Sequence, residues 1–271
     1  MVRSPLRHFI AIVLCSLVSS LSLHASAASL ESVKQRGSIR IGVEPGFLPF
    51  EMQTPKGEWV GFDVAMMQAF AQSLGVKADF VGAKWDGIIP GLMAGKYDVI
   101  TSGMTITDDR AKTVLFSDPY YEAGLKVLVA KKLAGTAKTL DDVDQAQHTV
   151  VVKLGTTGDI FVTKTLKKAK IRRLDSEADA AQSVLLGKAD AFIYDRPYLE
   201  IYESGQKGKV ALLAPLVSTE HFGVAAKKSD VALMNAFNAF LKDWRAKGEY
   251  DKAYKAMFVD LTWKSQFPQL F

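Results

Sequence analysis

The sequence predicts an α/β fold in which two lobes face a common cleft, and two observations lead to this prediction. Short β-rich runs alternate with helix-length segments from residue 39 onward, a pattern typical of largely parallel sheets covered by helices. In addition, residues 92–100 and 185–193 each end a helix, turn at Gly-Lys, and enter a strand that runs into polar residues. Ligands of α/β proteins bind beyond the carboxyl ends of strands. Chance is the alternative for this repeat, because helix–glycine–strand is common in α/β folds.

The individual elements follow from local patterns. Residues 39–43 are β-rich and end at Glu-Pro-Gly, a turn signal. Apolar residues recur at helical spacing over 64–74, and Gly75 ends that helix. We expect Asp63 to cap this helix and Asp86 to cap the next, which ends at Gly95. The remaining elements are expected as strands near 97–101, 127–130, 149–153, 189–194 and 221–226, and as helices near 159–168, 178–186, 231–247 and 249–258.

The N-terminus has the three-part organisation of a secretory signal peptide. Arg3 and Arg7 form a basic region, an apolar run follows over residues 9–18, and Ala25-Ser26-Ala27 is a small-x-small cleavage site. A membrane anchor fits less well, because the run is shorter than the roughly 20 residues that span a bilayer. We expect residues 1–27 to be removed and the mature protein to reside in the periplasm.

Composition excludes several classes of function. The only cysteine, Cys15, lies in the signal region, so we expect no disulfide, thiolate metal site or cysteine nucleophile. The net charge of +5 is interspersed, and the basic cluster at 164–173 is explained by a solvated helix face, so nucleic-acid binding is not expected. Beyond the signal region only His148 and His221 remain, and neither lies in a nucleophile or metal motif. We therefore expect no cofactor, no metal and no catalytic residue.

The most specific stretches are Trp85-Asp86-Gly87-Ile88-Ile89-Pro90-Gly91-Leu92, residues 98–110, and Phe116-Ser117-Asp118-Pro119-Tyr120-Tyr121, together with Gly61-Phe62-Asp63-Val64 and Gly155-Thr156-Thr157-Gly158. In this order they resemble the polar amino-acid class of bacterial extracellular solute-binding proteins, family 3, the receptors of ABC importers. The resemblance implies a type II periplasmic-binding fold with two hinge crossovers. It places lobe 1 at 28–121 and 222–271, and lobe 2 at 122–221.

Residue chemistry fits the same ligand class, a zwitterionic amino acid. The guanidinium of Arg110 can bind a carboxylate through two parallel hydrogen bonds, and Thr107 is a good N-cap that would place Arg110 in a first helical turn. We expect Ser102, Gly103 and Thr105, with the N–H groups before the helix at Thr157, to complete the anion site. Asp195 would accept from the ammonium group. The alternatives are a surface ion pair for Arg110 and helix-cap roles for Thr157 and Asp195.

Aromatic residues are expected to form the walls of the side-chain pocket. Phe47 and Trp85 fall in a loop and before a helix, at positions where the resemblance implies ligand contact, whereas Phe50 is expected in the core. Glu44 would suit a cationic or amide side chain beside these rings, and the alternative is that it faces water.

Two functions follow from this reading. The first is a monomeric receptor that captures a free amino acid, expected to be polar or basic, and delivers it to an inner-membrane ABC permease. The second is a cyclohexadienyl dehydratase, an enzyme that the resemblance implies on the same fold and that needs a positioned general acid. No carboxylic acid beyond Asp195 and Glu44 is aimed at the expected cleft, so the receptor is the favoured prediction and an enzyme is not expected.

Overall fold

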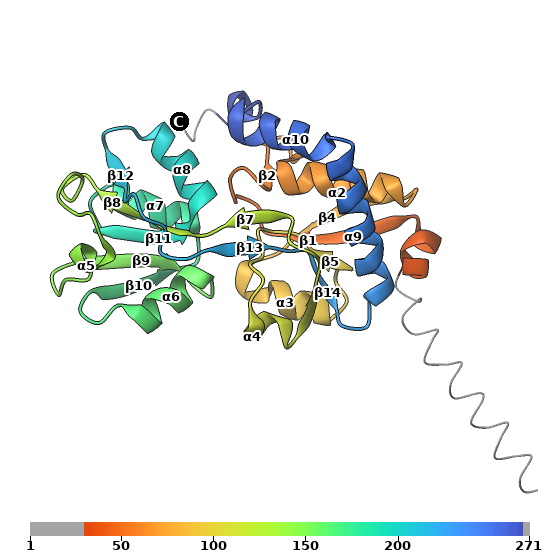
Figure 1. The fold of residues 1–271 in the computed structure, drawn as a ribbon, viewed down its shortest axis with the longest axis horizontal. Helices are drawn as coiled ribbons and strands as arrows, with labels where there is room; N and C mark the ends of the chain where they lie inside the picture. The colour runs from red at the N-terminus through yellow and green to blue at the C-terminus, as the bar shows by residue number, and fades with distance from the viewer. Residues whose placement is uncertain (1–29, 268–271) are drawn as a thin grey trace, which may run out of the picture.

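The computed structural model describes residues 30–267 of the chain, so the expected signal peptide at 1–27 lies outside the described residues. The described chain forms two five-stranded sheets side by side, with a two-stranded ribbon running between them (Figure 1). Over residues 30–267, none of the helices combines the length and the apolar character needed to cross a membrane.

The first sheet combines N-terminal strands with one strand from the C-terminal part. β1 pairs in parallel with β4 and β5, whereas β14 runs antiparallel to both β5 and β6. Four of the five strands therefore point the same way, as the predicted largely parallel sheet requires. Their order is β4 (Lys77–Gly82), β1 (Ser38–Val43), β5 (Val99–Ile100), β14 (Ala225–Lys227) and β6 (Val114–Phe116).

The second sheet repeats this arrangement with strands from the middle of the chain. β9 pairs in parallel with β10 and β11, whereas β8 runs antiparallel to β11 and β12. Again only one strand opposes the other four. Their order is β10 (Lys170–Leu174), β9 (Thr149–Lys153), β11 (Ala191–Asp195), β8 (Leu125–Ala130) and β12 (Val210–Leu212).

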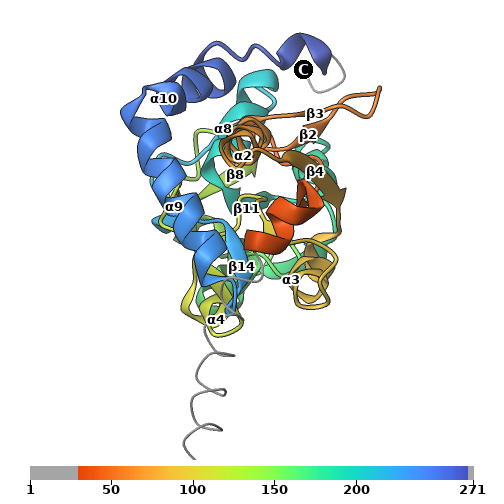
Figure 2. The same ribbon diagram turned by 90° about the vertical axis from the view of Figure 1, so that its right-hand side faces the viewer.

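Helices cover the faces of both sheets, and their apolar residues explain why. In the first lobe α2 and α3 lie on opposite sides of the sheet (Figures 1 and 2). The helices of the first lobe include α2 (Phe62–Ser73), α3 (Trp85–Met93), α4 (Asp108–Ala111), α9 (Val231–Ala246) and α10 (Glu249–Tyr254). Those of the second are α5 (Leu140–Val143), α6 (Thr157–Thr165), α7 (Glu177–Leu185) and α8 (Arg196–Gly205). Separate apolar clusters lie under α2 and under α3, so both faces of the first sheet are buried.

The two sheets are connected through a short antiparallel ribbon of β7 (Tyr121–Ala123) and β13 (Glu220–Phe222). Both chain crossings therefore lie next to each other, with Tyr121 opposite Phe222. The lobe boundaries predicted at residues 121 and 222 fall on this ribbon. That each lobe moves as a unit about them stays a prediction.

The repeated helix–glycine–strand pattern is present in both lobes. α3 ends at Met93 and leads through Gly95 (φ 76°) to β5, and α7 ends at Leu185 and leads through Gly187 (φ 68°) to β11. The left-handed backbone at each turn favours glycine. The two lobes thus present the ends of matching strands to each other.

Several local predictions were wrong in detail. The segment 221–226 is not one strand: β13 ends at Phe222, and β14 begins at Ala225 in a different sheet. The last predicted helix, near 249–258, is helical throughout, but only α10 to Tyr254 is α-helical, and it continues as a π-helix at Lys255–Val259. A 3₁₀ helix follows at Lys264–Gln266. A further short hairpin, β2 (Met52–Gln53) and β3 (Trp59–Val60), precedes α2.

The predicted helix caps at Asp63 and Asp86 are also wrong. α2 has Gly61 as its N-cap, α3 has Lys84, and neither receives a side-chain cap hydrogen bond. Asp63 is instead fully buried and accepts hydrogen bonds from the backbone N–H of Gly103 and the hydroxyl of Tyr120. A long-range partner has replaced the local role that the sequence suggested.

Candidate functional site

Polar residues stand at the carboxyl ends of parallel strands in both lobes. β1 ends immediately before Glu44 and β5 immediately before the Thr101–Ser102 pair, whereas β9 ends at Lys153 and β11 at Asp195. These ends face each other across the junction of the lobes. Ligands of α/β proteins bind at such ends, and the site is described from here.

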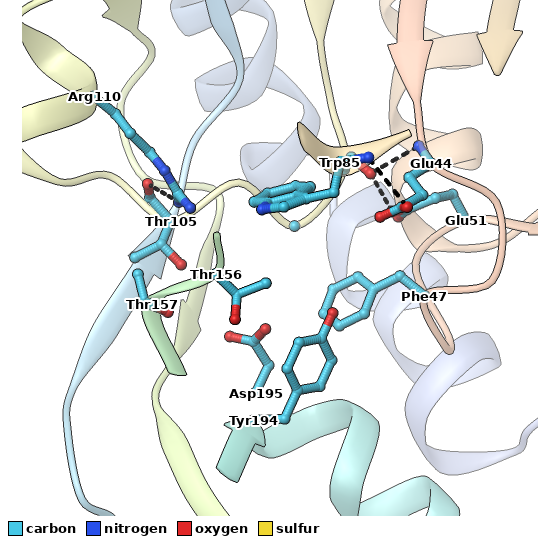
Figure 3. A pocket seen from close by; sticks show the side chains of 12 residues that line it. Glu44, Phe47, Glu51, Trp85, Thr105, Arg110, Thr156, Thr157, Tyr194 and Asp195 are labelled. Atoms are coloured by element: carbon cyan, nitrogen blue, oxygen red, sulfur yellow. Dashed lines mark hydrogen bonds between the residues drawn. The ribbon is translucent and has the colours of Figure 1, made fainter. Parts of the chain in front are cut away.

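One cavity at this junction gathers the residues that the sequence singled out (Figure 3). All nine of them line it, together with three that were not predicted, Glu51, Thr156 and Tyr194. Arg110 lies at one end of the cavity and Glu44 with Glu51 at the other, with Trp85 between the two ends (Figure 3). The nine are Glu44, Phe47, Trp85, Ser102, Gly103, Thr105, Arg110, Thr157 and Asp195. That each contacts a ligand stays a prediction.

Arg110 is fixed by its own short helix. Thr107 is the N-cap of α4 and accepts a hydrogen bond from the backbone N–H of Arg110. The guanidinium turns back toward the preceding loop, and its Nη1 donates to the carbonyl of Thr105 at 2.9 Å. Its carbon lies 5.1 Å from the centre of the Trp85 ring. Burial lowers the pKa of Arg110, and the charges of Asp195 and Glu220 oppose that shift, so the group remains a cation.

Asp195 offers a free acceptor to the cavity. It is buried at the end of β11, makes no side-chain cap to α8, and its Oδ1 atom has no hydrogen-bond partner among the described residues. Burial raises its pKa well above the usual range, Glu220 raises it further, and Arg110 and Lys153 act in the opposite direction. A donor group placed in the cavity would satisfy this oxygen and favour the ionised form.

Glu220 holds the two threonine hydroxyls of the site. It belongs to the connecting strand β13, and its Oε2 accepts from Thr105 Oγ1 at 3.0 Å and from Thr157 Oγ1 at 2.8 Å. Its other oxygen accepts from Ser218 Oγ at 2.9 Å. One carboxylate of the ribbon therefore links a residue of each lobe. Thr157 is the first residue of α6, whose N-cap is Thr156 and not Thr157.

Glu44 is paired across the lobes with Lys153, which was not expected. Lys153 Nζ donates to the carboxylates of Glu44 and of Glu177, the latter at 2.6 Å. The other oxygen of Glu44 accepts from the backbone N–H of Trp85 at 3.2 Å. Burial raises the pKa of Glu44 and Lys153 opposes this shift. Burial alone would lower the pKa of Lys153, but Glu177 and Glu44 outweigh it, so the pKa is raised.

Ser102 and Gly103 form the loop under the cavity. Ser102 Oγ donates to Glu51 Oε1 at 2.6 Å and accepts from the backbone N–H of Glu44 at 3.0 Å. Its single hydroxyl hydrogen is therefore used inside the first lobe. Gly103 has φ 52°, and a Cβ there would lie 2.2 Å from the ring of Phe47. Glycine is thus required by both backbone and packing.

Aromatic rings form the walls between the two ends. Phe47 is buried, stacks on Phe50 with centroids 5.0 Å apart, and meets Tyr194 edge-on at 5.9 Å. Phe50 is fully buried, as predicted. Trp85 is half-buried, and its Nε1 donates to the carbonyl of Gly155 in the other lobe at 3.1 Å. Aromatic rings therefore line the cavity between its charged ends, beside the polar side chains of Thr156 and Asp195 (Figure 3).

Within residues 30–267 no group of three or more His, Cys, Asp or Glu side chains is arranged to hold a metal ion. What the site offers is a guanidinium, helix N–H groups and a free carboxylate oxygen, with an acid-rich far end.

A sequence pattern that covers most of the chain decides its family. The sequence pattern of the bacterial extracellular solute-binding proteins, family 3, matches residues 39–260. The chain belongs to this family. The resemblance inferred from the motifs is confirmed, and so is the two-lobed fold class of this solute-binding protein.

Named relatives are binding proteins and one enzyme. This solute-binding protein is 35% identical over 224 residues to a probable histidine-binding protein of Neisseria gonorrhoeae, a match covering 81% of this chain and 82% of the relative. It is 41% identical to the solved structure of a "putative binding component of ABC transporter" from Wolinella succinogenes complexed with lysine, with a TM-score of 0.81 and coverage of 84% and 98%. It is 30% identical over 190 residues to a cyclohexadienyl dehydratase of Pseudomonas aeruginosa, with coverage of 70% and 71%.

Besides Thr156 and Tyr194, four charged residues in or beside the site of this solute-binding protein were missed from the sequence: Glu51, Lys153, Glu177 and Glu220. Lys153 carried a signal, because a lysine that ends the apolar run Val150-Val151-Val152 needs a counter-charge if it is buried. Glu51 follows the core residue Phe50 and carried a similar signal. Nothing in the local sequence marks Glu220, whose two threonine partners come from other segments.

Proposed function

We propose that this protein is a periplasmic receptor that captures a free amino acid between its two lobes and delivers it to an inner-membrane ABC permease. The observation that carries the proposal is the shared cavity of Arg110 and Asp195. One is a cation at the first lobe and the other an acid at the second, and neither forms an ion pair among the described residues. An amino-acid zwitterion supplies the missing partner of each.

The two ends of the zwitterion have distinct partners in this proposal. The carboxylate lies against the guanidinium of Arg110 and the N–H groups at the start of α6, where helix geometry favours an anion. The ammonium donates to Asp195 Oδ1. The hydroxyls of Thr105 and Thr157 join the anion site when they donate their hydrogen bonds to the ligand carboxylate instead of to Glu220.

The far end of the cavity favours a polar or basic ligand side chain. The side chain passes between Trp85 and Phe47 and reaches Glu44 and Glu51 (Figure 3). Lys153 already pairs with Glu44, yet Glu177 and Glu51 leave carboxyl groups in excess there. A side chain that donates hydrogen bonds suits this end better than an acidic one.

Closure follows from the same contacts. The ligand touches Arg110 in one lobe and Asp195 in the other, so it binds most tightly when the lobes are together. Because both lobes belong to one chain, the site is complete in a monomer, and we propose that state. No catalytic step is needed for this role, and we propose that the protein is not an enzyme.

A dehydratase is the second candidate, and one observation favours it. Asp195 has a raised pKa and a free oxygen in the cavity, which are properties of a general acid. The same properties fit an ammonium partner, so an experiment must separate the two functions.

The test is native purification followed by mass spectrometry of any small molecule carried along, then calorimetric titration with a panel of amino acids and an assay of prephenate consumption. We expect an amino acid to bind and Asp195→Asn to weaken it at least tenfold, since a charged hydrogen bond contributes about 1.5–3 kcal/mol. Asp175→Asn, at an exposed position, is the control. Turnover of prephenate that Asp195→Asn abolishes, without amino-acid binding, would establish the enzyme instead.

A further inference from the structure

The two crossovers between the lobes lie close together just beyond the connecting ribbon. β7 and β13 pair as far as Ala123, which lies opposite Glu220. Past this pair, Val217 donates its backbone N–H to the carbonyl of Leu125 at 2.9 Å. In a regular antiparallel pair the return bond would run from the N–H of Leu125 to the carbonyl of Val217. The chain departs from that pattern at this point.

Ser218 takes the place of the backbone acceptor. Its Oγ accepts from the N–H of Leu125 at 3.1 Å and donates to Glu220 Oε1 at 2.9 Å. A serine hydroxyl has one hydrogen and an ionised carboxylate only accepts, so the direction of the second bond is fixed. Ser218 therefore fastens the carboxylate of Glu220 to the backbone of the other crossover.

The second oxygen of the Glu220 carboxylate reaches both lobes. Glu220 Oε2 accepts from Thr105 Oγ1 at 3.0 Å in the first lobe and from Thr157 Oγ1 at 2.8 Å in the second. A continuous series of hydrogen bonds thus runs from Leu125, through Ser218 and Glu220, to one hydroxyl of each lobe. Ser218 is the donor on one carboxylate oxygen, and the two threonines are the donors on the other.

Ser218 and Glu220 lie behind these threonines and outside the amino-acid cavity. Thr105 and Thr157 line two cavities, the one of the proposed function and a second of about 410 Å³ beside the connecting ribbon. Ser218 and Glu220 line the second cavity and not the first. The two threonines therefore separate the Glu220 carboxylate from the amino-acid cavity, and that carboxylate has space on its far side.

Binding of a ligand carboxylate changes the hydrogen bonds of Glu220. In the proposed function both threonine hydroxyls turn to the ligand, so Oε2 gives up two donors at once. A half-buried carboxylate that loses every donor is costly. The hydrogen bond from Ser218 is not involved in the exchange and stays on Oε1. It therefore lowers the free energy that Glu220 loses when the ligand binds.

We propose that Ser218 is a positioning residue of the amino-acid site, which holds Glu220 beside the ribbon while the hydroxyls of Thr105 and Thr157 pass to the ligand. Ser218 acts through Glu220 and does not touch the ligand. This role rests on the proposed function. Because Ser218 also accepts from Leu125, the same hydrogen bonds connect the site to the place where the lobes join.

The test is a double-mutant cycle of Ser218→Ala and Glu220→Gln, measured by calorimetric titration. The standard L-amino acids are screened on the wild type, and the one that binds most tightly is used for every variant. We expect Ser218→Ala to weaken binding about fivefold, which corresponds to about one net hydrogen bond. In the Glu220→Gln background the same change should weaken binding less than about twofold, because a neutral amide loses less than a carboxylate when its donor is removed.

Two variants control for the loss of a serine as such. Ser229→Ala is the matched control, because Ser229 also donates to a nearby carboxylate, Asp230 Oδ1 at 2.9 Å, outside the site. It should bind as the wild type does. Ser218→Thr keeps the hydroxyl and should retain the wild-type affinity. A serine that only supported the backbone of Leu125 would give the same loss in both Glu220 backgrounds.

Equal losses in the two backgrounds, or wild-type affinity in Ser218→Ala, would overturn the proposal. If Ser218→Ala does not fold, Ser218→Cys replaces it in the cycle, since a thiol is only a weak donor. Ser218→Cys should then bind more weakly than Ser218→Thr, and equal affinities would refute the role of Ser218. If no standard amino acid binds the wild type, the proposed function fails and this role fails with it. Binding by the wild type without coupling in the cycle refutes the role of Ser218 alone.

Discussion

Lys153, at the end of β9 in the second lobe, donates a hydrogen bond to the carboxylate of Glu44, at the end of β1 in the first. Its other carboxylate partner, Glu177, lies on α7 in its own lobe. The lysine side chain is only 3% exposed. This ion pair crosses the junction of the lobes, so it exists only while the lobes are together.

Lys153→Met should therefore weaken the closed state. Loss of the ammonium leaves Glu44 and Glu177 as buried carboxyl groups without a cation, a change that costs about 3–5 kcal/mol in buried pairs. We expect at least a tenfold loss of amino-acid affinity, together with a larger radius of gyration in scattering. Lys132→Met is the control, because Lys132 pairs with Asp190 while its own side chain is 62% exposed. Unchanged affinity in Lys153→Met would show that the pair is incidental.

Glu220→Gln should tighten amino-acid binding. Glu220 accepts the hydroxyl hydrogens of Thr105 and Thr157 and places a negative charge near the expected ligand carboxylate. Hydrogen bonds to a charged acceptor are about twice as strong as neutral ones. A neutral amide oxygen at residue 220 therefore competes less with the ligand carboxylate for the two threonine hydroxyls. We expect a gain of about threefold or more by calorimetry, with no change in Glu122→Gln on the facing strand. Weaker binding would mean that Glu220 acts mainly to fasten the lobes.

Arg110→Lys keeps the positive charge and removes the planar fork. A lysine ammonium cannot make two parallel hydrogen bonds to a carboxylate. We expect amino-acid affinity to fall more than tenfold in calorimetric titration. Arg172→Lys, on an exposed part of β10, should bind as the wild type does. If both variants bind equally well, Arg110 serves the structure alone.

Gly103→Ala should damage both stability and binding. The added Cβ meets the Phe47 ring at 2.2 Å, and the φ of 52° strains any side chain. Overpacking costs about 1–3 kcal/mol and left-handed backbone about 1–2 kcal/mol, so we expect at least about 2 kcal/mol in chemical unfolding. Gly57→Ala separates the two causes, since Gly57 has φ 84° but no atom within 4 Å of its Cβ. Similar losses in both variants would show that packing at Gly103 is unimportant.

Much of the fold and the site followed from local patterns. Ser102 and Asp195 could be placed because each stands at the carboxyl end of an apolar strand, Ser102 just beyond it and Asp195 as its last residue. Strand ends of an α/β sheet meet at one edge. Arg110 could be oriented because Thr107 marks the start of its helix. These are short-range rules, and they held where no distant residue competed with them.

The rest depends on contacts between distant segments. Asp63 was assigned as a helix cap because it stands at the start of a predicted helix. Its hydrogen-bond partners are instead Gly103 and Tyr120, which lie far along the chain. Glu44 was expected to face a ligand or water, and its partner Lys153 is 109 residues away. Local propensity carries no information about such pairs, because they exist only once the lobes are assembled.

The central claim is that an amino acid binds between the lobes and holds them together. Small-angle scattering and thermal unfolding of the wild type, with and without each amino acid of a panel, test it most directly. A ligand that favours the closed state should reduce the radius of gyration and raise the melting temperature together. A polar or basic amino acid that produces both changes is the predicted result. If no amino acid changes either quantity while prephenate is consumed, the account is contradicted and the protein is an enzyme.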